Sequence, residues 1–429
     1  MSLPRYPAYK DSGVAWLGEV PGHWWVKPVK AVASCNDEVL DESTPADYEI
    51  EYVEISGVDA GRGITSTDVI PFGGAPSRAR RRVQDGDVLV STVRTYLRSI
   101  APINNPPDNM IASTGFAVVR PRMIKPHFLG YLFQAEFLIS EVIARSVGVS
   151  YPAINASDLM RLKVPIPFAD EQSAIAAFLD RETGKIDTLV AEQEKLIQLL
   201  REKRQAVISR AVTKGINPAA PMKDSGIEWL GEVPEHWKVA RLKYKLRLLT
   251  EKTERREHPI ALENIESGTG HFIETETEFE GEGIAFEQGD ILFGKLRPYL
   301  AKVYLVEIAG EAVGDFHVLR PVGDVVGRFA QYQIISGNFI AIVDSSTFGA
   351  KMPRVAWEFM GNMPFVTPPL EEQKAIATFL DRETAKLDAL TAVAQRGIEL
   401  LKERRSALIS AAVTGKIDVR TFSPVLEAA

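Results

Sequence analysis

The amino-acid sequence predicts an α+β protein built twice: two globular parts joined by a pair of long antiparallel helices, as an internal repeat with pseudo-twofold symmetry. Two repeated stretches indicate this architecture. The segment that opens at Asp11 (DSGVAWLGEVPGHW) returns at Asp224 (DSGIEWLGEVPEHW), with 11 of 14 positions identical. The segment DEQSAIAAFLDRETGKID from Asp170 returns from Glu371 as EEQKAIATFLDRETAKLD. Two long matches in the same order exclude coincidence, so each copy is a globular part followed by a helix.

Composition sets limits on the class of protein. Of the 429 residues, 45% are apolar and 25% are charged, which is ordinary for a globular chain of two or three domains. The single cysteine, Cys35, excludes an internal disulfide and fits a reducing cytoplasm. No run of 18 apolar residues exists, so we expect no transmembrane helix. The net charge of −7 argues against a protein that coats nucleic acid, but it allows a local basic face.

Each globular part is expected to alternate strands and turns between the repeated landmarks. Residues 83–93 in the first copy and 286–296 in the second are each expected to be a turn that enters a strand, and further strands are expected at 115–120 and 315–320. A Gly-Asp turn precedes the first strand of each copy, at Gly86 and Gly289. The openings are 213 residues apart but the helical segments only 201, so the first globular part is 12 residues longer. Constant ends around a variable middle indicate one scaffold that carries two specificities.

The segments 170–211 and 371–412 are predicted to be helices, because they lack proline and are rich in good helix formers. Apolar residues at steps of three and four predict a coiled-coil seam between them, with a helix lying on its own domain as the alternative. The predicted seam residues are Ile186, Leu189, Leu196, Leu200 and Val207 in the first helix and Leu387, Leu390, Ile398, Leu401 and Leu408 in the second. We expect Gly184 to break the first helix, and Lys214-Gly215 and Gly415-Lys416 to end the two helices.

A pseudo-twofold relation between the copies, the usual arrangement of a matched pair, determines the direction of the helices. The first helix carries the chain from one globular part to the other, and by symmetry the second helix returns it. The helices are therefore expected to be antiparallel. Thr183–Arg210 is 28 residues, or about 42 Å at about 1.5 Å per residue. One turn of B-DNA is about 34–36 Å, so the two parts could each enter a major groove of one split, asymmetric site.

Several stretches resemble the specificity subunit of type I restriction–modification enzymes. In the second copy these are the WLGEVPEHW opening, PPLEEQKAIATFLDRET before the helix, and LLKERRSALISAAVTGKI at its end. The first copy has WLGEVPGHW, DEQSAIAAFLDRET and LLREKRQAVISRAVTKGI at the matching places. Two departures, Phe168-Ala169 for Pro-Leu and Lys214-Gly215 for Gly-Lys, remove no structural element. The resemblance covers nearly the whole chain.

The resemblance implies a non-catalytic subunit that gives a larger enzyme its DNA specificity. The implied parts are target recognition domains at 1–169 and 216–369, conserved helices at 170–215 and 370–417, and a tail at 418–429. Double-stranded DNA, two methyltransferase subunits and restriction subunits are the implied partners, in the cytoplasm and without a membrane. The methyltransferase uses S-adenosylmethionine to methylate adenine in a bipartite site. The restriction subunit uses ATP and Mg to translocate and cut DNA, so we expect no cofactor in this chain.

The sequence itself offers no catalytic motif. Asn105-Pro106-Pro107 resembles the N-P-P-aromatic motif of adenine methyltransferases, but an aspartate follows, so no ring can stack on a flipped base and a turn is expected. Thr213-Lys214-Gly215 is not a Walker sequence. The six histidines lack metal-ligand spacing, so no metal site is expected. His23 and His236 are expected to pack beside tryptophans, in openings that either support the scaffold or contact a partner.

Candidates for DNA contact come from comparing the two copies. Phosphate contacts carry no sequence information and base contacts do, so matched residues should serve the scaffold or phosphates and mismatched residues should recognise bases. Arg94 matches Arg297, which fits phosphate clamping or an ion pair with a nearby aspartate. Tyr96 and Tyr299 also match and are expected in the core. The candidates are Thr92, Arg94, Arg98, Lys295 and Arg297 after the strands, and Ser150, Tyr151, Lys351 and Arg354 in a second pair of loops.

Basic clusters add further candidates. Arg78, Arg80, Arg81 and Arg82 form the densest basic run and predict phosphate contacts, with a solvated loop as the alternative. The basic ends of the helices, which include Arg204 and Arg405, could face DNA, a partner or solvent. Two other classes of protein stay open: a DNA-binding regulator that acts alone, and a coiled-coil scaffold with protein-binding heads. No code links loop residues to bases, so the sequence predicts a split site but not its letters or its spacer length.

Overall fold

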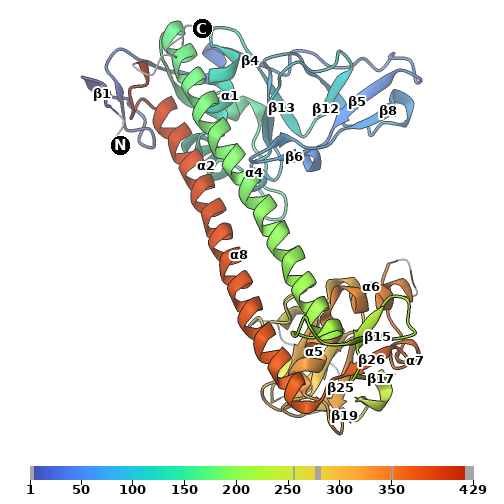
Figure 1. Ribbon diagram of the computed structural model, residues 1–429. Coiled ribbons are helices and arrows are strands. Elements are labelled where there is room, and N and C mark those ends of the chain that lie inside the picture. Colours follow the sequence, from blue (N-terminus) through green and yellow to red (C-terminus); the bar gives the residue numbers. More distant parts are fainter. Residues whose placement is uncertain (1–3, 255–256, 276–281, 348, 350, 421–429) are drawn as a thin grey trace. The chain divides into compact units, whose positions relative to one another are not determined.

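The computed structural model describes residues 4–254, 257–275, 282–347, 349 and 351–420. It divides into two compact units, which are described separately (Figure 1). Unit 1 comprises Met1–Gln193 and Arg396–Ala429, and unit 2 comprises Glu194–Gln395. Each unit contains one sheet-rich part and a portion of each long helix, α4 (Ala169–Lys214) and α8 (Leu370–Val413). The predicted α+β class with two sheet-rich parts and two long helices is confirmed.

Unit 1 is built around two four-stranded sheets. One has the order β11-β10-β13-β4 and is antiparallel throughout; the other has the order β8-β5-β12-β9, in which β5 and β12 are parallel. Two-stranded pairs β1-β2, β3-β14 and β6-β7 surround them. The strands are β1 (Tyr9–Asp11), β2 (Glu19–Pro21), β3 (Trp25–Pro28), β4 (Ala33–Cys35), β5 (Glu49–Val53), β6 (Val58–Asp59), β7 (Gly63–Ile64), β8 (Asp68–Pro71), β9 (Ala79–Arg82), β10 (Val88–Ser91), β11 (Ile100–Pro102), β12 (Met110–Ser113), β13 (Phe116–Pro121) and β14 (Lys163–Ile166). The short helices are α1 (Pro126–Gln134), α2 (Glu136–Ala144) and α3 (Ala156–Leu159).

Unit 2 repeats this topology. Its sheets have the orders β23-β22-β25-β18 and β20-β24-β21-β19, with β20 and β24 as the parallel pair, and β15-β16 and β17-β26 as two-stranded pairs. The strands are β15 (Met222–Asp224), β16 (Glu232–Pro234), β17 (Lys238–Arg241), β18 (Leu246–Leu249), β19 (Lys252–Thr253), β20 (Pro259–Ile260), β21 (Gly283–Phe286), β22 (Ile291–Gly294), β23 (Val303–Leu305), β24 (Gly310–Val313), β25 (Phe316–Pro321) and β26 (Pro364–Thr367). The short helices are α5 (Gly327–Ile335), α6 (Gly337–Ser345) and α7 (Trp357–Met360). The repeat in the sequence is therefore a repeat of structure.

The predicted turns and strands match the observed ones closely. Gly86 and Gly289 have φ of 80° and 90°, a conformation that glycine adopts without strain, and each turns the chain into the strand that follows. The strands expected around residues 115–120 and 315–320 are present as β13 and β25, each shifted by one residue. Strand β8 has no counterpart in the described part of unit 2, and the stretch of sequence that contains β8 is where the first copy is longer.

Each hydrophobic core takes residues from both long helices. In unit 1, the core around the fully buried Trp24 includes residues from the start of α4 and the end of α8: Ile175, Phe178, Leu179, Ile409, Ala412 and Val413. In unit 2, the core around Trp237 includes residues from the end of α4 and the start of α8: Ile208, Ala211, Val212, Ile376 and Leu380. Because the start of one helix meets the end of the other, the helices are antiparallel within each unit.

Two equivalent ion pairs join the helices. In unit 1, Arg405 Nε lies 2.9 Å from Asp187 Oδ1. In unit 2, the buried Arg204 donates from Nε to Asp388 Oδ1 at 3.1 Å, and its other nitrogens donate to the carbonyls of residues 268 and 269. The two arginines are 201 residues apart, as are the two aspartates. The sequence had offered DNA, a partner or solvent for these basic residues, but Arg204 and Arg405 instead pair with aspartates of the other helix.

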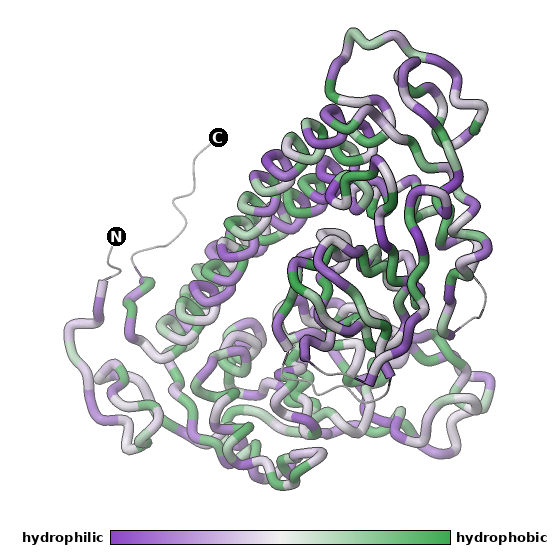
Figure 2. Tube along the Cα trace, turned by 90° about the horizontal axis from the view of Figure 1, so that it is seen from below, coloured by the Kyte–Doolittle hydropathy of each residue, from purple (hydrophilic) through white to green (hydrophobic). Residues whose placement is uncertain are grey.

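The buried positions of both helices follow one pattern with steps of three and four residues. The same alternation is visible in Figure 2, where hydrophilic and hydrophobic residues alternate along the helices. In α4 the buried and half-buried positions are Ile186, Val190, Gln193, Ile197, Leu200, Arg204, Val207 and Ile208. In α8 they are, 201 residues later, Leu387, Thr391, Ala394, Ile398, Leu401, Arg405, Leu408 and Ile409. This is the heptad spacing of an antiparallel coiled coil.

Three predicted seam residues lie outside this face. Leu189, Leu196 and Leu390 are 44%, 42% and 53% exposed. The sequence pattern counted apolar residues only, whereas the polar Arg204 occupies a seam position because Asp388 and neighbouring carbonyls satisfy its side chain. The leucines one residue away from the seam were therefore assigned to it incorrectly.

The predicted break at Gly184 is wrong, because α4 is continuous over 46 residues. A Cβ added at Gly184 would meet nothing within 4 Å, so this glycine lies on the exposed side of an intact helix. The predicted helix ends are confirmed. Gly215 and Gly415, with φ of 75° and 72°, follow the last residues of α4 and α8.

The tryptophan-rich openings dock on the starts of the helices. In unit 1, the carboxylate of the buried Glu171 accepts hydrogen bonds from Trp24 Nε1 at 3.0 Å and from the His23 ring at 2.9 Å. In unit 2, His236 makes the equivalent contact with Glu372 at 2.7 Å. The openings therefore support the scaffold, which was one of the two predicted roles.

Replacing Gly184 by alanine should stabilise the protein. The helix is intact at this position, no neighbour opposes a methyl group, and the second copy already has alanine there, at Ala385. The gain expected from helix propensity is about 0.5–1 kcal/mol, measured by chemical or thermal unfolding. Gly215→Ala is the control: its positive φ and the Trp237 ring 3.2 Å from an added Cβ make it destabilising. A neutral or destabilising Gly184→Ala would show that the helix bends at this residue.

Candidate nucleic-acid interface

In unit 1, backbone hydrogen bonds join two loops into one exposed structure, here called tip 1 (residues 92–98 and 147–154). The first loop follows β10 and contains a single 3-10 turn, Thr95–Leu97. The Arg94 N–H donates to the Pro152 carbonyl at 2.8 Å, and the Ile154 N–H donates to the Thr92 carbonyl at 2.9 Å. The two loops therefore form one element.

Unit 2 builds the same element, here called tip 2 (residues 295–301, 349 and 351–355). The Arg297 N–H donates to the Pro353 carbonyl at 2.8 Å, and the Val355 N–H donates to the Lys295 carbonyl at 3.1 Å. Both bonds have equivalents in tip 1. The loops predicted separately from the sequence are thus brought together in both units.

The matched arginines have a strained backbone. Arg94 and Arg297 have φ of 52° and 50°, in the left-handed region that non-glycine residues rarely adopt. Such a conformation costs about 1–3 kcal/mol and persists only where the surroundings hold it, often at functional sites. Both side chains are exposed. Both units thus hold one exposed arginine in the same strained backbone conformation, so the scaffold presents an arginine at each tip.

Tip 1 has an aromatic and mostly uncharged surface around this arginine. The Arg94 guanidinium lies over the Tyr151 ring, 4.6 Å from its centre. Tyr151 and the neighbouring Ser150 are exposed, and Tyr96 is half-exposed. Tyr96 and its match Tyr299 were expected in the core, and the structure corrects this, because the 3-10 turn points both rings outward.

Tip 2 has a charged cluster instead. The Arg354 side chain donates to both oxygens of the Asp315 carboxylate, from Nε at 3.1 Å and from Nη2 at 2.8 Å. Lys295 Nζ lies 3.7 Å from the same carboxylate. The hydrogen bond from Arg354 lowers the pKa of Asp315 below its usual range, and the same pairing raises the pKa of Arg354. Lys351 and Arg297 are exposed nearby in the chain.

Two candidates in the first loop already have partners. Arg98 forms a two-bond ion pair with Glu136 at the start of α2, at 2.7 and 2.8 Å. The Thr92 hydroxyl donates to the Gly115 carbonyl at 2.9 Å. Contact with DNA would have to displace these bonds, so both residues are weaker candidates than Arg94.

The predicted arginine run is a strand and not a loop, because Arg80, Arg81 and Arg82 belong to β9. The Arg80 guanidinium lies over the Phe72 ring at 4.9 Å, and Arg81 Nε is buried without a hydrogen-bond partner among the described residues. Arg82 is half-buried. The guanidinium groups of these arginines are thus partly used in packing. Arg78, just before the strand, pairs with the Glu54 carboxylate, and its carbonyl accepts a hydrogen bond from residue 114 beside tip 1.

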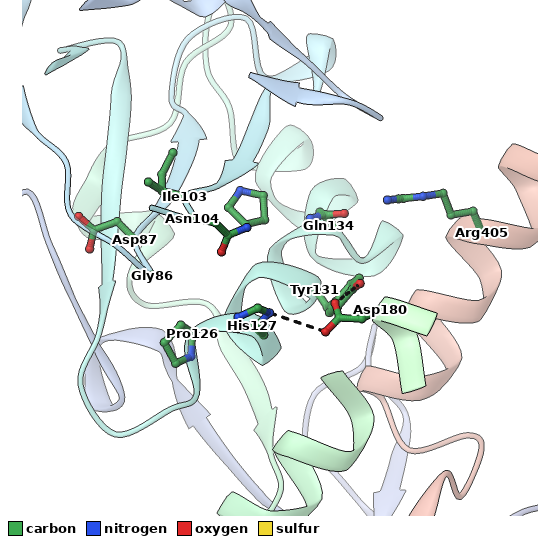
Figure 3. Close-up of a pocket in the computed structure, with 11 residues that line it drawn as sticks. Gly86, Asp87, Ile103, Asn104, Pro126, His127, Tyr131, Gln134, Asp180 and Arg405 are labelled. Atoms are coloured by element: carbon green, nitrogen blue, oxygen red, sulfur yellow. Dashed lines mark hydrogen bonds and ion pairs between the residues drawn. The ribbon is translucent and has the colours of Figure 1, made fainter. Parts of the chain in front are cut away.

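A small pocket of about 120 Å³ in unit 1 belongs to the helix contacts (Figure 3). Within it, the Tyr131 hydroxyl donates to Asp180 on α4 at 2.7 Å, and His127 lies 3.7 Å from the same carboxylate. Unit 2 repeats the first contact as Tyr332 with Asp381. A contact that both copies share serves the scaffold, so we do not regard this pocket as a ligand site.

The comparisons with known proteins agree with this architecture. Residues 73–198, which include tip 1, match the family model described as type I restriction modification DNA specificity domain. A putative type I restriction enzyme MjaX specificity subunit of Methanocaldococcus jannaschii is 25% identical, over 94% of this chain and 96% of that protein. The EcoDI specificity subunit of Escherichia coli is 23% identical, over 70% and 72%. Over most of its length, the chain is similar to these type I restriction enzyme specificity subunits.

A solved structure shares the fold of this chain. It comes from a study entitled structural basis underlying complex assembly and conformational transition of the type I R-M system, and it has a TM-score of 0.70 at 21% identity. The similarity covers 93% of this chain and 99% of that one. At this identity, the likeness establishes the fold of the present chain. The exposed tips are where its two sheet-rich parts differ in chemistry.

Neither a metal site nor a membrane helix is found in the described residues of the chain. No group of three or more His, Cys, Asp or Glu side chains there could hold a metal ion. Within the same residues, no helix is long and apolar enough to cross a membrane.

Asp315 is the site residue that sequence reasoning missed. Its position as the first residue of the predicted strand 315–320, where the first copy has Gly115, was the available signal.

The carboxyl group of Asp315 should titrate below its ordinary pKa of 3.8, chiefly because of the hydrogen bond from Arg354. A lowered pKa in the folded state means that the pair contributes stability above the ordinary pKa and loses it as the pH falls through the lowered one. Carbon-13 NMR of the side-chain carboxyl, titrated downward from neutrality, measures this. Arg354→Ala should return the midpoint towards the ordinary value, and Lys295→Ala should move it less. An unchanged midpoint in Arg354→Ala would contradict the pairing.

Proposed function

We propose that the chain is the DNA-specificity subunit of a type I restriction–modification complex, and that each tip recognises one half of an asymmetric, bipartite DNA site. The observation that supports this most strongly is the pair of tips. Both are formed by the same backbone hydrogen bonds, yet tip 1 is aromatic and tip 2 is charged. A common framework with different exposed side chains is what two different half-sites require.

In this proposal, the matched and mismatched residues have separate tasks. Arg94 and Arg297 contact phosphates, because they are the matched, exposed cations of the two tips. Phosphate contacts set position and affinity but not sequence. Ser150, Tyr151, Lys351 and Arg354 differ between the copies, and they contact bases. A chain with a net charge of −7 binds DNA through such local cations.

The long helices, we infer, set the spacer between the half-sites. Each helix is continuous, and the heptad pattern with its ion pairs fixes how one helix lies along the other in each unit. A fixed register of two rigid helices gives a fixed separation of two binding elements.

The helices also provide a surface for partners. Exposed apolar residues lie outside the seam, at Leu189, Leu196, Leu199, Leu390, Val393 and Leu400. Leucines exposed in such rows are typical of helix–helix interfaces. We propose that two methyltransferase subunits, which use S-adenosylmethionine, dock there in the cytoplasm. Restriction subunits that use ATP and Mg join later. The chain itself is non-catalytic in this proposal.

The proposal is tested by co-expression with a methyltransferase of the same kind of system. The complex should co-purify, and methylation mapping of the host DNA should yield one split, non-palindromic motif with adenine methylated in each half. A control without the specificity subunit should give no methylation. Methylation without a split motif would overturn the bipartite proposal, and DNA-specific binding by the chain alone with no complex would favour an independent regulator.

Shortening both helices by one heptad should shorten the spacer and leave the half-sites unchanged. Deleting 190–196 and 391–397 together removes equivalent residues and preserves the seam pattern. Seven residues are about 10 Å of helix, close to three base pairs of about 3.4 Å. The methylated motif of the purified complex measures both properties. Deleting only one of the two heptads is the control, and it should abolish assembly because the seams no longer match. Changed half-sites with an unchanged spacer would contradict the inference.

A further inference from the structure

Three positions have the same backbone but different side chains in the two tips. The Lys295 N–H donates to the Asp315 carbonyl at 2.9 Å, and the Thr92 N–H donates to the Gly115 carbonyl at 2.8 Å. Lys295 is bridged to the second loop through Val355, as Thr92 is through Ile154. The backbone thus pairs Lys295 with Thr92 and Asp315 with Gly115.

The third position follows from the strand-like bridges between the loops. Arg354 is bridged to Leu296, as Ala153 is bridged to Val93. The charged set of tip 2 (Lys295, Asp315, Arg354) therefore replaces the uncharged set of tip 1 (Thr92, Gly115, Ala153). Tip 1 closes with the same hydrogen bonds and no charges, so the fold does not need them. A cluster of three charges that folding does not require calls for a functional explanation.

The geometry of the pair leaves one edge of the guanidinium available. Arg354 uses Nε and Nη2, the side edge of its planar fork, to hold the two oxygens of Asp315. A guanidinium has five N–H donors, so three remain, and the Nη1–Nη2 edge presents two of them in parallel. The side chain is 46% exposed. Asp315 thus fixes the plane of Arg354 in advance and directs a two-donor edge outward.

A parallel pair of donors fits one base in the major groove. Guanine presents two adjacent acceptors there, O6 and N7, which an arginine contacts with two bonds. We propose that Arg354, oriented by Asp315 and assisted by Lys295, recognises a guanine in the half-site bound by unit 2. Tip 1 has Thr92, Gly115 and Ala153 at the equivalent positions. It therefore does not require a guanine at the corresponding position of its half-site. This inference rests on the proposed function.

A phosphate could also accept two bonds from an arginine, and substitutions separate the two ligands. A phosphate contact carries no sequence information, so its loss weakens methylation equally at all sites. A base contact is lost at one position of the motif. Lysine keeps the charge of arginine but lacks the planar edge, so Arg354→Lys preserves much of a phosphate contact and abolishes the two-bond contact with guanine.

The experiment uses the complete chain co-expressed with its methyltransferase, and it maps methylation over a plasmid library in which both half-sites are randomised. Arg354→Ala, Arg354→Lys and Asp315→Asn should each reduce the preference for guanine at the same single position by about tenfold or more. The half-site of unit 1 should stay unchanged in all three variants. Arg297→Ala, at the matched arginine of the same tip, is the control and should lower methylation without changing the motif. Thermal unfolding of each complex verifies folding.

Each outcome decides between distinct claims. A split motif that loses guanine at one position in all three variants supports the inference. A split motif that Arg354→Ala leaves unchanged, or weakens uniformly, overturns it while the proposed function stands. A change with Arg354→Ala but none with Asp315→Asn removes the positioning role of Asp315. Absence of any split motif in the unaltered complex defeats the proposed function itself.

Discussion

Each globular core depends on both long helices. Residues from the start of one helix and the end of the other pack around Trp24 in unit 1 and around Trp237 in unit 2. The core of unit 1 therefore combines two separate stretches of chain, whereas the core of unit 2 comes from the single stretch Glu194–Gln395. The pairs Arg204–Asp388 and Arg405–Asp187 fix the register of the helices beside these cores. A buried charge such as that of Arg204 adds little net stability but penalises any arrangement that removes its partner, so the Arg204–Asp388 pair favours one register.

This framework lets the two copies differ where they face solvent. Backbone hydrogen bonds hold the loops of each tip, and the strained arginines at 94 and 297 are kept in both. The side chains around them carry no structural task that both copies share. Tip 1 presents a tyrosine under its arginine, whereas tip 2 presents an aspartate that orients Arg354. Under the proposed function, specificity can therefore change by substitution at a few exposed positions without cost to the cores.

The repeat, the helices and the loops with candidate residues could be predicted from the sequence, because they depend on local patterns. Contacts between distant residues could not. Leu189 satisfied the apolar spacing but lies outside the seam, since its neighbour Val190 takes the half-buried position. Arg98 was predicted to contact DNA, but its side chain pairs with Glu136, which is 38 residues away in the sequence. Asp315 was not predicted, because its role depends on its ion pair with Arg354, a residue distant in the sequence.

The most direct test converts tip 2 to the residues of tip 1, with Lys295→Thr, Asp315→Gly and Arg354→Ala in one chain. The recognition motif of the methyltransferase complex is then compared with that of the unaltered complex. The account predicts the same spacer, an unchanged half-site for unit 1, and a half-site for unit 2 that has lost its requirement for guanine. A folded, active complex with an unchanged motif would contradict the claim that specificity lies where the copies differ.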